Sequence, residues 1–312
     1  MQREGRIVKC VGGLYTVYFE DGSEAACKAK GAFRHENTKP VAGDRAIVKG
    51  DADDPSGISL TEICKRKNMF VRPPLANIDV IFVVMAAARP EPILTTFDKL
   101  ICLAEYMNIE PVVIITKADL DPKRADELAS IYKKSGFTVF KTDIVSESFK
   151  TELFDYIKRE ANDKLSCFAG ASGVGKSTLM TSLFPELDLK TGEVSRKIGR
   201  GKQTTRHIEL FPISRLIPGL DGSTGFIADT PGFSVLDFLR LDFFSKEDLA
   251  LNFREFEKYI GKCRYTKCTH LCEEGCAICE AVRNGEIPKE RHDSFVEIYN
   301  ELKDKHDWSK HR

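Results

Sequence analysis

Residues 170–177 read GASGVGKS, a glycine-rich loop of the form G-x-x-x-x-G-K-S between the apolar run LSCFAG and the helix-forming stretch STLMTSLF. The glycines let successive backbone N–H groups turn inward around phosphate oxygens, and the following helix directs its N-terminus at the anion. In this pattern Lys176 reaches the β and γ phosphates, and the Ser177 hydroxyl binds Mg²⁺. The loop therefore predicts a nucleoside triphosphate site. The expected contacts come from Gly170, Ala171, Ser172, Gly173, Val174, Gly175, Lys176, Ser177 and Thr178.

Strands and helices alternate on the N-terminal side of this loop. The continuous apolar runs at 78–86 and 111–116 suit strands that are covered on both faces. Residues 95–108, between them, space their apolar side chains as a helix does, and a second helix is expected to begin at Asp121-Pro122. This alternation predicts a doubly wound α/β domain.

The tetrapeptide Thr116-Lys117-Ala118-Asp119 follows the second apolar run and suits guanine recognition. The Asp119 carboxylate can accept hydrogen bonds from guanine N1–H and N2–H₂, a pair of donors that adenine lacks, and the Lys117 stem would lie over the base. Alone, the pattern also fits a solvated turn before a helix, and the nearby phosphate loop favours the guanine reading. Thr116 replaces the usual Asn and keeps only a hydroxyl, which leaves its contact with the phosphate loop open. Thr142, or SES at 146–148, is a candidate second base contact.

The order of the two motifs is reversed relative to ordinary GTPases, since 116–119 precede 170–177. A sheet domain tolerates such a circular permutation because its original termini lie close together. The metal-sensing segment then ends the domain and continues into whatever follows.

That metal-sensing segment is Asp229-Thr-Pro-Gly232. Asp229 is expected to hold Mg²⁺ through water, and the Gly232 N–H to sense the γ phosphate. Phe233 stands where the best-known GTPases carry the Gln that orients the attacking water, so intrinsic hydrolysis is expected to be slow.

A basic, glycine-rich stretch, GRGKQTTR at 199–206, lies between the phosphate loop and Asp229. Ordinary GTPases place a Mg²⁺-binding Thr in this interval, and Thr205 is the expected ligand, with Thr204 as the alternative. A basic loop beside the γ phosphate suits docking on a phosphate backbone, although a plain solvated loop has the same composition.

Five cysteines crowd into residues 263–279. The pattern Cys263-x₄-Cys268-x-His270-x₅-Cys276 supplies the Cys₃His set of a closed, structural zinc site. Cys272 and Cys279 are spare, and Cys279 could compete for the metal. Four basic residues surround the set and are expected to form a basic knob without nearby acids: Lys258, Lys262, Arg264 and Lys267.

The 312 residues suggest two or three domains. Residues 1–70 contain short strands such as RIVKCVGG, LYTVYF and DRAIV, which predict a small OB-like or SH3-like barrel. Residues 71–235 form the expected GTPase domain, and 236–312 a helical zinc-binding domain with one helix near 246–260. Equal numbers of basic and acidic residues, 47 each, leave the global charge uninformative about nucleic acid. No apolar run or leader suggests a membrane or secretion, so a cytoplasmic location is expected.

Taken together, these motifs resemble the ribosome small-subunit-dependent GTPase A (RsgA) family along essentially the whole chain. The resemblance implies an N-terminal OB-like, RNA-binding barrel, a circularly permuted P-loop GTPase domain and a C-terminal zinc domain. It also implies a late assembly factor that contacts small-subunit rRNA near the decoding region, hydrolyses GTP when the small subunit stimulates it, and then leaves. The implied cofactors are GTP/GDP, Mg²⁺ and one structural Zn²⁺, and the expected state is a monomer.

One position departs from the family pattern G-[KQ]-H-T-T, because Gln203 stands where members often carry a His. Gln can orient water but cannot take a proton, and we hypothesise that Gln203 substitutes. The expected catalytic residues are thus Lys176, Thr205 and Gln203.

Two other functions compete with a GTPase. The chain could be an RNA-bound placeholder whose nucleotide state only sets its affinity, with incidental hydrolysis. A P-loop kinase or ATPase is disfavoured by Asp119, which excludes adenine.

Overall fold

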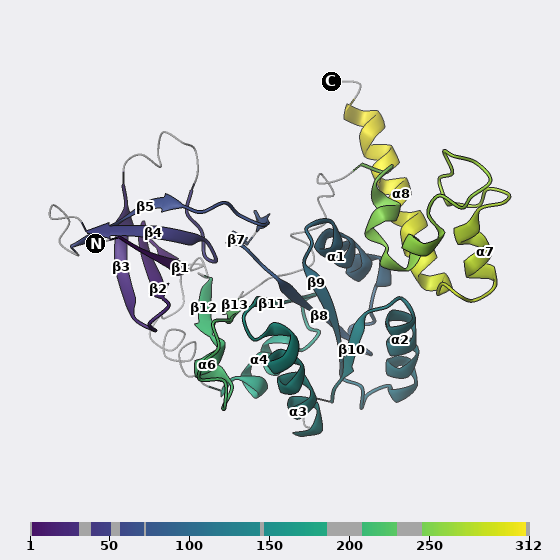
Figure 1. Cartoon of the computed structure of the whole chain (residues 1–312). Coiled ribbons are helices and arrows are strands. Elements are labelled where there is room, and N and C mark those ends of the chain that lie inside the picture. Colours follow the sequence, from purple (N-terminus) through teal and green to yellow (C-terminus); the bar gives the residue numbers. More distant parts are fainter. Residues whose placement is uncertain are drawn as a thin grey trace, which may run out of the picture. The chain divides into compact units, whose positions relative to one another are not determined.

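A computed structural model describes residues 2–30, 39–50, 57–71, 73–143, 147–185, 208–229 and 245–309, with side chains to residue 303 (Figure 1). The chain divides into two compact units. One comprises Met1–Val80, Glu152–Phe168 and Met180–Phe233, and the other Ile81–Thr151, Ala169–Leu179 and Ser234–Arg312. Each unit therefore combines segments that are distant in sequence.

The first unit begins with a closed five-stranded barrel of β1 (Gln2–Val11), β2 (Leu14–Phe19), β3 (Glu24–Ala29), β4 (Arg45–Gly50) and β5 (Ile58–Ile63). Strand β3 pairs parallel with β5, and β4 closes the barrel by pairing antiparallel with both β5 and β1. This order is the Greek-key barrel of the OB-like kind. The alternate inward side chains of each strand form the core: Ile7, Tyr15, Val17, Phe19, Cys27, Ala46, Val48 and Leu60.

Strands β3 and β5 were not foreseen from the sequence. EAACKA in β3 consists of residues with weak β propensity, so its composition does not announce a strand. Pairing with β2 and β5 supplies the hydrogen bonds that the local sequence does not specify.

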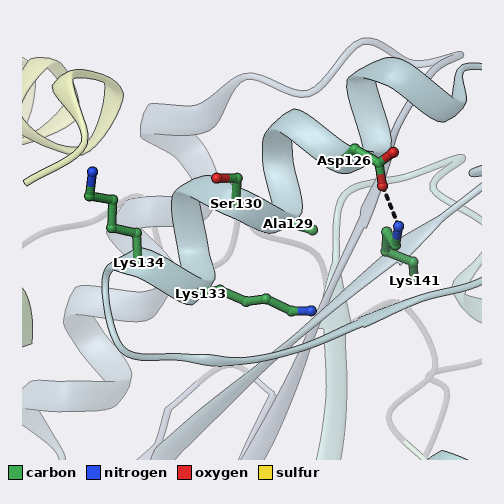
Figure 2. Close-up of a pocket in the computed structure, with 6 residues that line it drawn as sticks. All are labelled: Asp126, Ala129, Ser130, Lys133, Lys134 and Lys141. Atoms are coloured by element: carbon green, nitrogen blue, oxygen red, sulfur yellow. Dashed lines mark hydrogen bonds and ion pairs between the residues drawn. The ribbon is translucent and has the colours of Figure 1, made fainter. Parts of the chain in front are cut away.

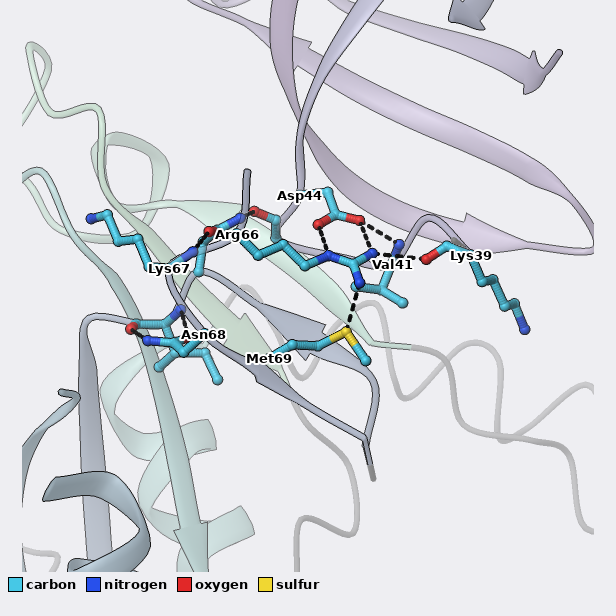
Figure 3. Close-up of polar contacts among 10 residues, drawn as sticks. Lys39, Val41, Asp44, Arg66, Lys67, Asn68 and Met69 are labelled. Atoms are coloured by element: carbon cyan, nitrogen blue, oxygen red, sulfur yellow. Dashed lines mark hydrogen bonds and ion pairs between the residues drawn. The ribbon is translucent and has the colours of Figure 1, made fainter. Parts of the chain in front are cut away.

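Figure 3 shows a polar clamp that joins the barrel to the segment leaving it. The guanidinium of Arg66 donates to both carboxylate oxygens of buried Asp44, at 2.7 and 2.8 Å, and the Val41 N–H donates to the same group at 2.8 Å. Gly43 has a φ of +89°, and a Cβ there would lie 2.0 Å from the Ala76 carbonyl oxygen, so only glycine fits this approach. The hairpin of β6 (Met69–Phe70) and β7 (Leu75–Ala76) contacts the segment beside the clamp, where the Ala76 N–H donates to the Ala42 carbonyl at 3.0 Å.

The hairpin leads to Asp79, which meets the first residue of β11 (Leu165–Gly170). The Asp79 N–H donates to the Leu165 carbonyl at 2.9 Å, and the Asp79 carboxylate accepts from the Leu165 N–H at 3.0 Å. Strand β11 pairs parallel with β13 (Phe226–Asp229), which pairs antiparallel with β12 (Glu209–Pro212). Strand β12 then reaches β1, where Lys9 and Glu209 form an ion pair at 2.8 Å. The short helix α6 (Ile213–Leu216) follows β12.

The second unit contains the alternating strands and helices that the sequence predicted. These are β8 (Val80–Ala86), α1 (Leu94–Tyr106), β9 (Glu110–Thr116), α2 (Pro122–Lys134), β10 (Thr138–Lys141) and the start of α3 (Glu147–Tyr156). The strand order is β10-β9-β8, with β9 and β10 parallel. The predicted cap is present, because the Asp121 carboxylate accepts from the Arg124 N–H at 2.9 Å. A π-helical turn, η2 (Ile157–Ala161), extends α3, and α4 (Lys176–Leu183) follows the phosphate loop.

The C-terminal segment packs two short 3₁₀ helices, η4 (Leu249–Asn252) and η5 (Arg254–Tyr259), with α7 (Ala277–Arg283) and α8 (Lys289–Ser309). The single helix expected near 246–260 is therefore wrong. Phe253 adopts an extended backbone, with φ −114° and ψ 94°, and interrupts it. The break lets Phe253 and Phe256 both pack on Phe295, with ring centroids 5.4 and 5.1 Å away. None of the helices described is both apolar and long enough to cross a membrane.

Candidate nucleotide site and zinc centre

The phosphate loop follows β11 without interruption and leads into α4, which begins at Lys176. Gly173 and Gly175 have φ values of +80° and +91°, a backbone that favours glycine. Gly170 lies so close to β8 that a Cβ there would sit 2.4 Å from the Val84 carbonyl oxygen. Val174 is buried, whereas Ser172, Gly173, Ser177 and Thr178 are exposed. The loop thus has one buried anchor and an open face.

Thr116, at the end of β9, reaches this loop through its side chain. Its fully buried hydroxyl lies 2.5 Å from the Val174 carbonyl oxygen and 3.1 Å from that of Met85. A hydroxyl carries one proton, so the shorter contact is the main donation. The Thr116 hydroxyl therefore suffices for a contact with the phosphate loop, and the missing Asn amide is not needed for it.

Lys117 forms the second link between the two motifs. Its ammonium donates to the Gly173 carbonyl at 2.8 Å and also to the Arg89 carbonyl, after β8. Its φ of +55° is unusual for a residue with a side chain and turns the backbone sharply at the end of β9. Lys117 thus joins the loops that follow β8, β9 and β11 at one place.

Asp119 lies in the turn between β9 and α2, and its side chain is exposed. The neighbouring Ala118 N–H donates to the Thr142 carbonyl at 3.2 Å, and the Thr142 N–H donates to the Ile115 carbonyl at 2.8 Å. The backbone of Thr142, the candidate second base contact, therefore lies beside the guanine motif, but the residue is buried, with 2% exposed.

Asp229 ends β13 and is half-buried. Ala228 pairs with Cys167 in parallel register, and Asp229 is the next and last residue of β13. Gln203, Thr204, Thr205, Gly232 and Phe233 lie outside the described residues, as does Ser146.

A surface hollow between α2 and β10 contains none of the predicted site residues (Figure 2). It is lined by Asp126, Ala129, Ser130, Lys133, Lys134 and Lys141. Asp126 and Lys141 form an ion pair across it.

The four predicted zinc ligands converge, with their ligand atoms within 4.8 Å of one another. The His270 Nδ1 atom lies 3.5 Å from the Cys263 Sγ atom and 3.6 Å from the Cys276 Sγ atom, and these two sulfurs are 3.9 Å apart. A tetrahedral zinc with ordinary Zn–S and Zn–N bonds requires about 3.6 Å between nitrogen and sulfur and about 3.8 Å between sulfurs. The geometry therefore fits one structural Zn²⁺.

Two residues that the sequence did not single out hold this site together. The His292 Nε2 atom lies 2.8 Å from the His270 carbonyl oxygen, and His270 itself has a φ of +63°. Glu273 accepts hydrogen bonds from the Thr269 N–H at 2.7 Å and from the Thr269 hydroxyl. Burial alone would raise the pKa of Glu273, but these hydrogen bonds lower it to about 2. No short motif connects His292 or Glu273 with zinc, so only the folded chain reveals them.

The spare cysteines differ in position. Cys279 lies beside the set, where its N–H donates to the Cys276 sulfur at 3.5 Å, and its own sulfur contacts the His270 carbonyl at 3.5 Å. Cys272 is exposed. Neither belongs to the group of four converging ligands.

The expectation of basic residues without nearby acids is wrong for two of the four. Arg264 pairs with Glu274 at 3.5 Å and Lys258 with Glu286 at 3.7 Å. The fold brings acids that lie 10 and 28 positions away in sequence to these cations.

A family model described as RsgA GTPase matches residues 63–239, and one described as RsgA N-terminal domain matches residues 4–58. This chain belongs to the RsgA GTPase family. As a member, it is a GTP hydrolase, and the family uses GTP/GDP and Mg²⁺.

The sequences of two relatives align with nearly the whole length of this RsgA family member. The "Small ribosomal subunit biogenesis GTPase RsgA" of Caldanaerobacter subterraneus subsp. tengcongensis is 40% identical over 303 residues, covering 97% of this chain and 96% of the relative. The protein of that name from Bacillus cereus is 37% identical over 306 residues, covering 97% and 98%.

Two solved structures share the fold. YloQ, described as a circularly permuted GTPase, is 32% identical with a TM-score of 0.76, covering 98% of this chain and 96% of that one. YjeQ from Thermotoga maritima is 30% identical with a TM-score of 0.77, covering 97% and 99%. The permuted GTPase fold predicted from the motif order is thereby confirmed.

Proposed function

We propose that this chain is a GTPase that acts in late maturation of the small ribosomal subunit, hydrolysing GTP to GDP and phosphate slowly alone and faster on the subunit. The observation that carries the proposal is the joining of the guanine motif to the phosphate loop. Thr116 and Lys117 contact Val174 and Gly173, which are 58 and 56 positions away in sequence. The relatives named for small-subunit biogenesis support the choice of partner.

The chain's own residues divide the work between the two ends of the nucleotide. Asp119, exposed in the turn after β9, accepts hydrogen bonds from guanine, and Lys117 covers the base. The inward N–H groups of 170–178 and Lys176 stabilise charge on the phosphates. Ser177, Thr205 and Asp229 are the proposed groups around Mg²⁺, which neutralises phosphate charge when bound. Gly232 senses the γ phosphate.

Hydrolysis also needs an oriented water, and Gln203 is the proposed residue for that task. Phe233 cannot perform it, which accounts for the slow intrinsic rate. If Gln203→Ala hydrolysed GTP on small subunits as fast as the unaltered chain, this role would be excluded.

The proposed domains are 1–70, 71–235 and 236–312. The family models at 4–58 and 63–239 support the first two, and the converging cysteines and histidine support the third. We further propose that the chain is a cytoplasmic monomer that binds small-subunit rRNA through the barrel, the basic loop at 199–206 and the zinc domain.

One assay tests the proposal. GTP hydrolysis is measured with and without purified small subunits, for the unaltered chain and for Lys176→Ala. We expect stimulation by orders of magnitude that Lys176→Ala abolishes, and equal rates with and without subunits would reject the proposal.

The competing placeholder role, which Phe233 and Gln203 keep open, would be favoured if Lys176→Ala still supported subunit maturation. Competition of labelled GTP by ATP tests the ATPase alternative.

A further inference from the structure

Tyr265 is a large aromatic side chain at the surface of the zinc segment, and nothing in the nucleotide or zinc chemistry uses it. Its side chain is 50% exposed, although an aromatic ring gains by burial. It lies between the ligands Cys263 and Cys268, in a stretch that is neither helix nor strand. An exposed ring at so constrained a place suggests a surface for a partner.

The backbone around Tyr265 is held from both sides. The Cys268 N–H donates to the Tyr265 carbonyl at 3.2 Å, and the Arg264 N–H donates to the Gly275 carbonyl at 2.9 Å. Gly275 has a φ of +76°, and a Cβ there would lie 2.8 Å from the Arg264 Cβ atom, so these two segments are in direct contact. Because three zinc ligands flank these residues, bound metal would immobilise them further. Because this backbone is already held in place, binding a partner through the Tyr265 ring would cost little backbone conformational entropy.

One cation contacts the ring, and two more lie close to Tyr265 in the sequence. The Arg264 guanidinium carbon lies 5.5 Å from the ring centroid, within cation–π range. Lys262 and Lys267, which flank Tyr265 in the sequence, are exposed, and neither has an ion-pair partner among the residues that the structure describes. A planar aromatic surface with cations around it matches an unpaired nucleotide, whose base stacks while its phosphates approach the ammonium groups.

We propose that Tyr265, with Arg264 beside it, is a stacking platform for an unpaired base of the RNA partner. The inference rests on the proposed function, which supplies small-subunit rRNA as that partner. A continuous double helix does not suit the platform, because its bases are already stacked on one another. The base sits on the Tyr265 ring, and Lys262 and Lys267 meet the phosphates on either side.

The test uses the full-length, zinc-loaded chain with a non-hydrolysable GTP analogue, and measures its Kd for purified small subunits. Tyr265→Ala weakens binding by about 5- to 150-fold, the range for loss of one stacked base. Tyr265→Phe keeps the aromatic face and binds within about twofold of the unaltered chain, whereas Tyr265→Leu binds as weakly as Tyr265→Ala. The matched control is Tyr106→Ala, which removes a tyrosine of similar exposure, 44%, from α1.

The outcomes separate this inference from the function on which it rests. Zinc content is measured for every variant, and Tyr265→Phe and Tyr265→Leu keep the test decisive if Tyr265→Ala fails to fold. Equal binding by the unaltered chain and Tyr265→Leu would indicate an apolar contact with a ribosomal protein and overturn the platform. Equal binding by Tyr265→Ala would overturn it too, while leaving the proposed function standing. An unaltered chain that does not bind small subunits would overturn both.

Discussion

The guanine motif with its phosphate loop and the zinc centre lie in the same compact unit, yet they are built on opposite principles. The nucleotide site is built on the backbone of three loops, which follow β8, β9 and β11. The side chains of Thr116 and Lys117 bind backbone carbonyls of the neighbouring loops and so join them. The zinc centre is organised by side chains on a segment with little regular structure. A sheet can preform the first site, whereas the second depends on its metal. The two sites should therefore respond differently to damage.

The largest expected effect is loss of zinc. Zinc binding supplies about 10 kcal/mol or more to the folding of small structural sites, so Cys276→Ser or chelation should unfold residues 263–276. The measurements are zinc content and hydrogen exchange in that segment. The matched control is Cys272→Ser, which removes an exposed thiol of the same segment and should retain one zinc. GTP affinity should stay within about twofold, and a parallel collapse of GTP binding would contradict the separation of the two sites.

The next effect concerns Arg291, which joins α8 to the GTPase core. Its fully buried guanidinium pairs with Asp98 on α1 at 2.5 Å and with Glu255 on η5 at 2.6 Å. Arg291→Met leaves two buried carboxylates without a counter-charge and should lower the free energy of unfolding by about 3–5 kcal/mol, as measured in urea. The control is Lys289→Met, which breaks an exposed pair on the same helix and should cost at most about 1 kcal/mol.

The same variant should show a definite pH dependence. Burial raises the pKa of Asp98 even with Arg291 present. A carboxyl whose pKa is higher in the folded state than in the unfolded state is protonated at a higher pH in the folded state. The free energy of unfolding therefore rises as the pH falls from the folded-state pKa to the unfolded-state pKa. Arg291→Met should therefore regain part of its lost stability on acidification. Urea midpoints at several pH values measure this, and an unchanged difference from the unaltered chain would argue against buried, unpaired charge.

Asp119→Asn tests the base-reading end of the nucleotide site. Hydrogen bonds to a charged group contribute about 1.5–3 kcal/mol, so GTP affinity should fall by about 10- to 150-fold, as measured with a fluorescent GTP analogue. The Asn amide can donate to a carbonyl at the same position of xanthine, so xanthosine triphosphate should gain relative to GTP. Asp126→Asn, an exposed α2 carboxylate paired with Lys141, should leave both affinities unchanged. If Asp119→Asn lost affinity for GTP without gaining affinity for xanthosine triphosphate relative to GTP, the base would not contact residue 119.

The smallest effect is expected at Thr116. Thr116→Val keeps the shape of the side chain but removes the donation to the Val174 carbonyl, worth about 1 kcal/mol, so GTP affinity should fall about fivefold. Thr116→Ser retains the hydroxyl and should bind within about twofold of the unaltered chain. Equal calorimetric Kd values for all three proteins would show that GTP binding does not depend on the Thr116 hydroxyl.

Much of the site could be read from contiguous residues. The phosphate loop, the guanine motif and the zinc ligands each need a fixed spacing over a few residues, and local backbone geometry links that spacing directly to chemistry. The motif order was sufficient to predict the permuted fold. Strand β3 and the break at Phe253 could not be predicted, because pairing with distant strands and packing on Phe295 override weak local preferences. Strand β5 was missed although its Ile58, Thr61 and Ile63 favour a strand.

The sequence by itself therefore predicted which groups would meet GTP and zinc, because each motif encodes its own local geometry. Only the tertiary structure decided how these groups are supported. The Thr116 contact with Val174, the His292 contact with the His270 carbonyl and the pairing of Arg264 with Glu274 all depend on distances between segments that no local pattern records. Such contacts arise from the packing of strands and loops, and packing is a property of the whole folded chain.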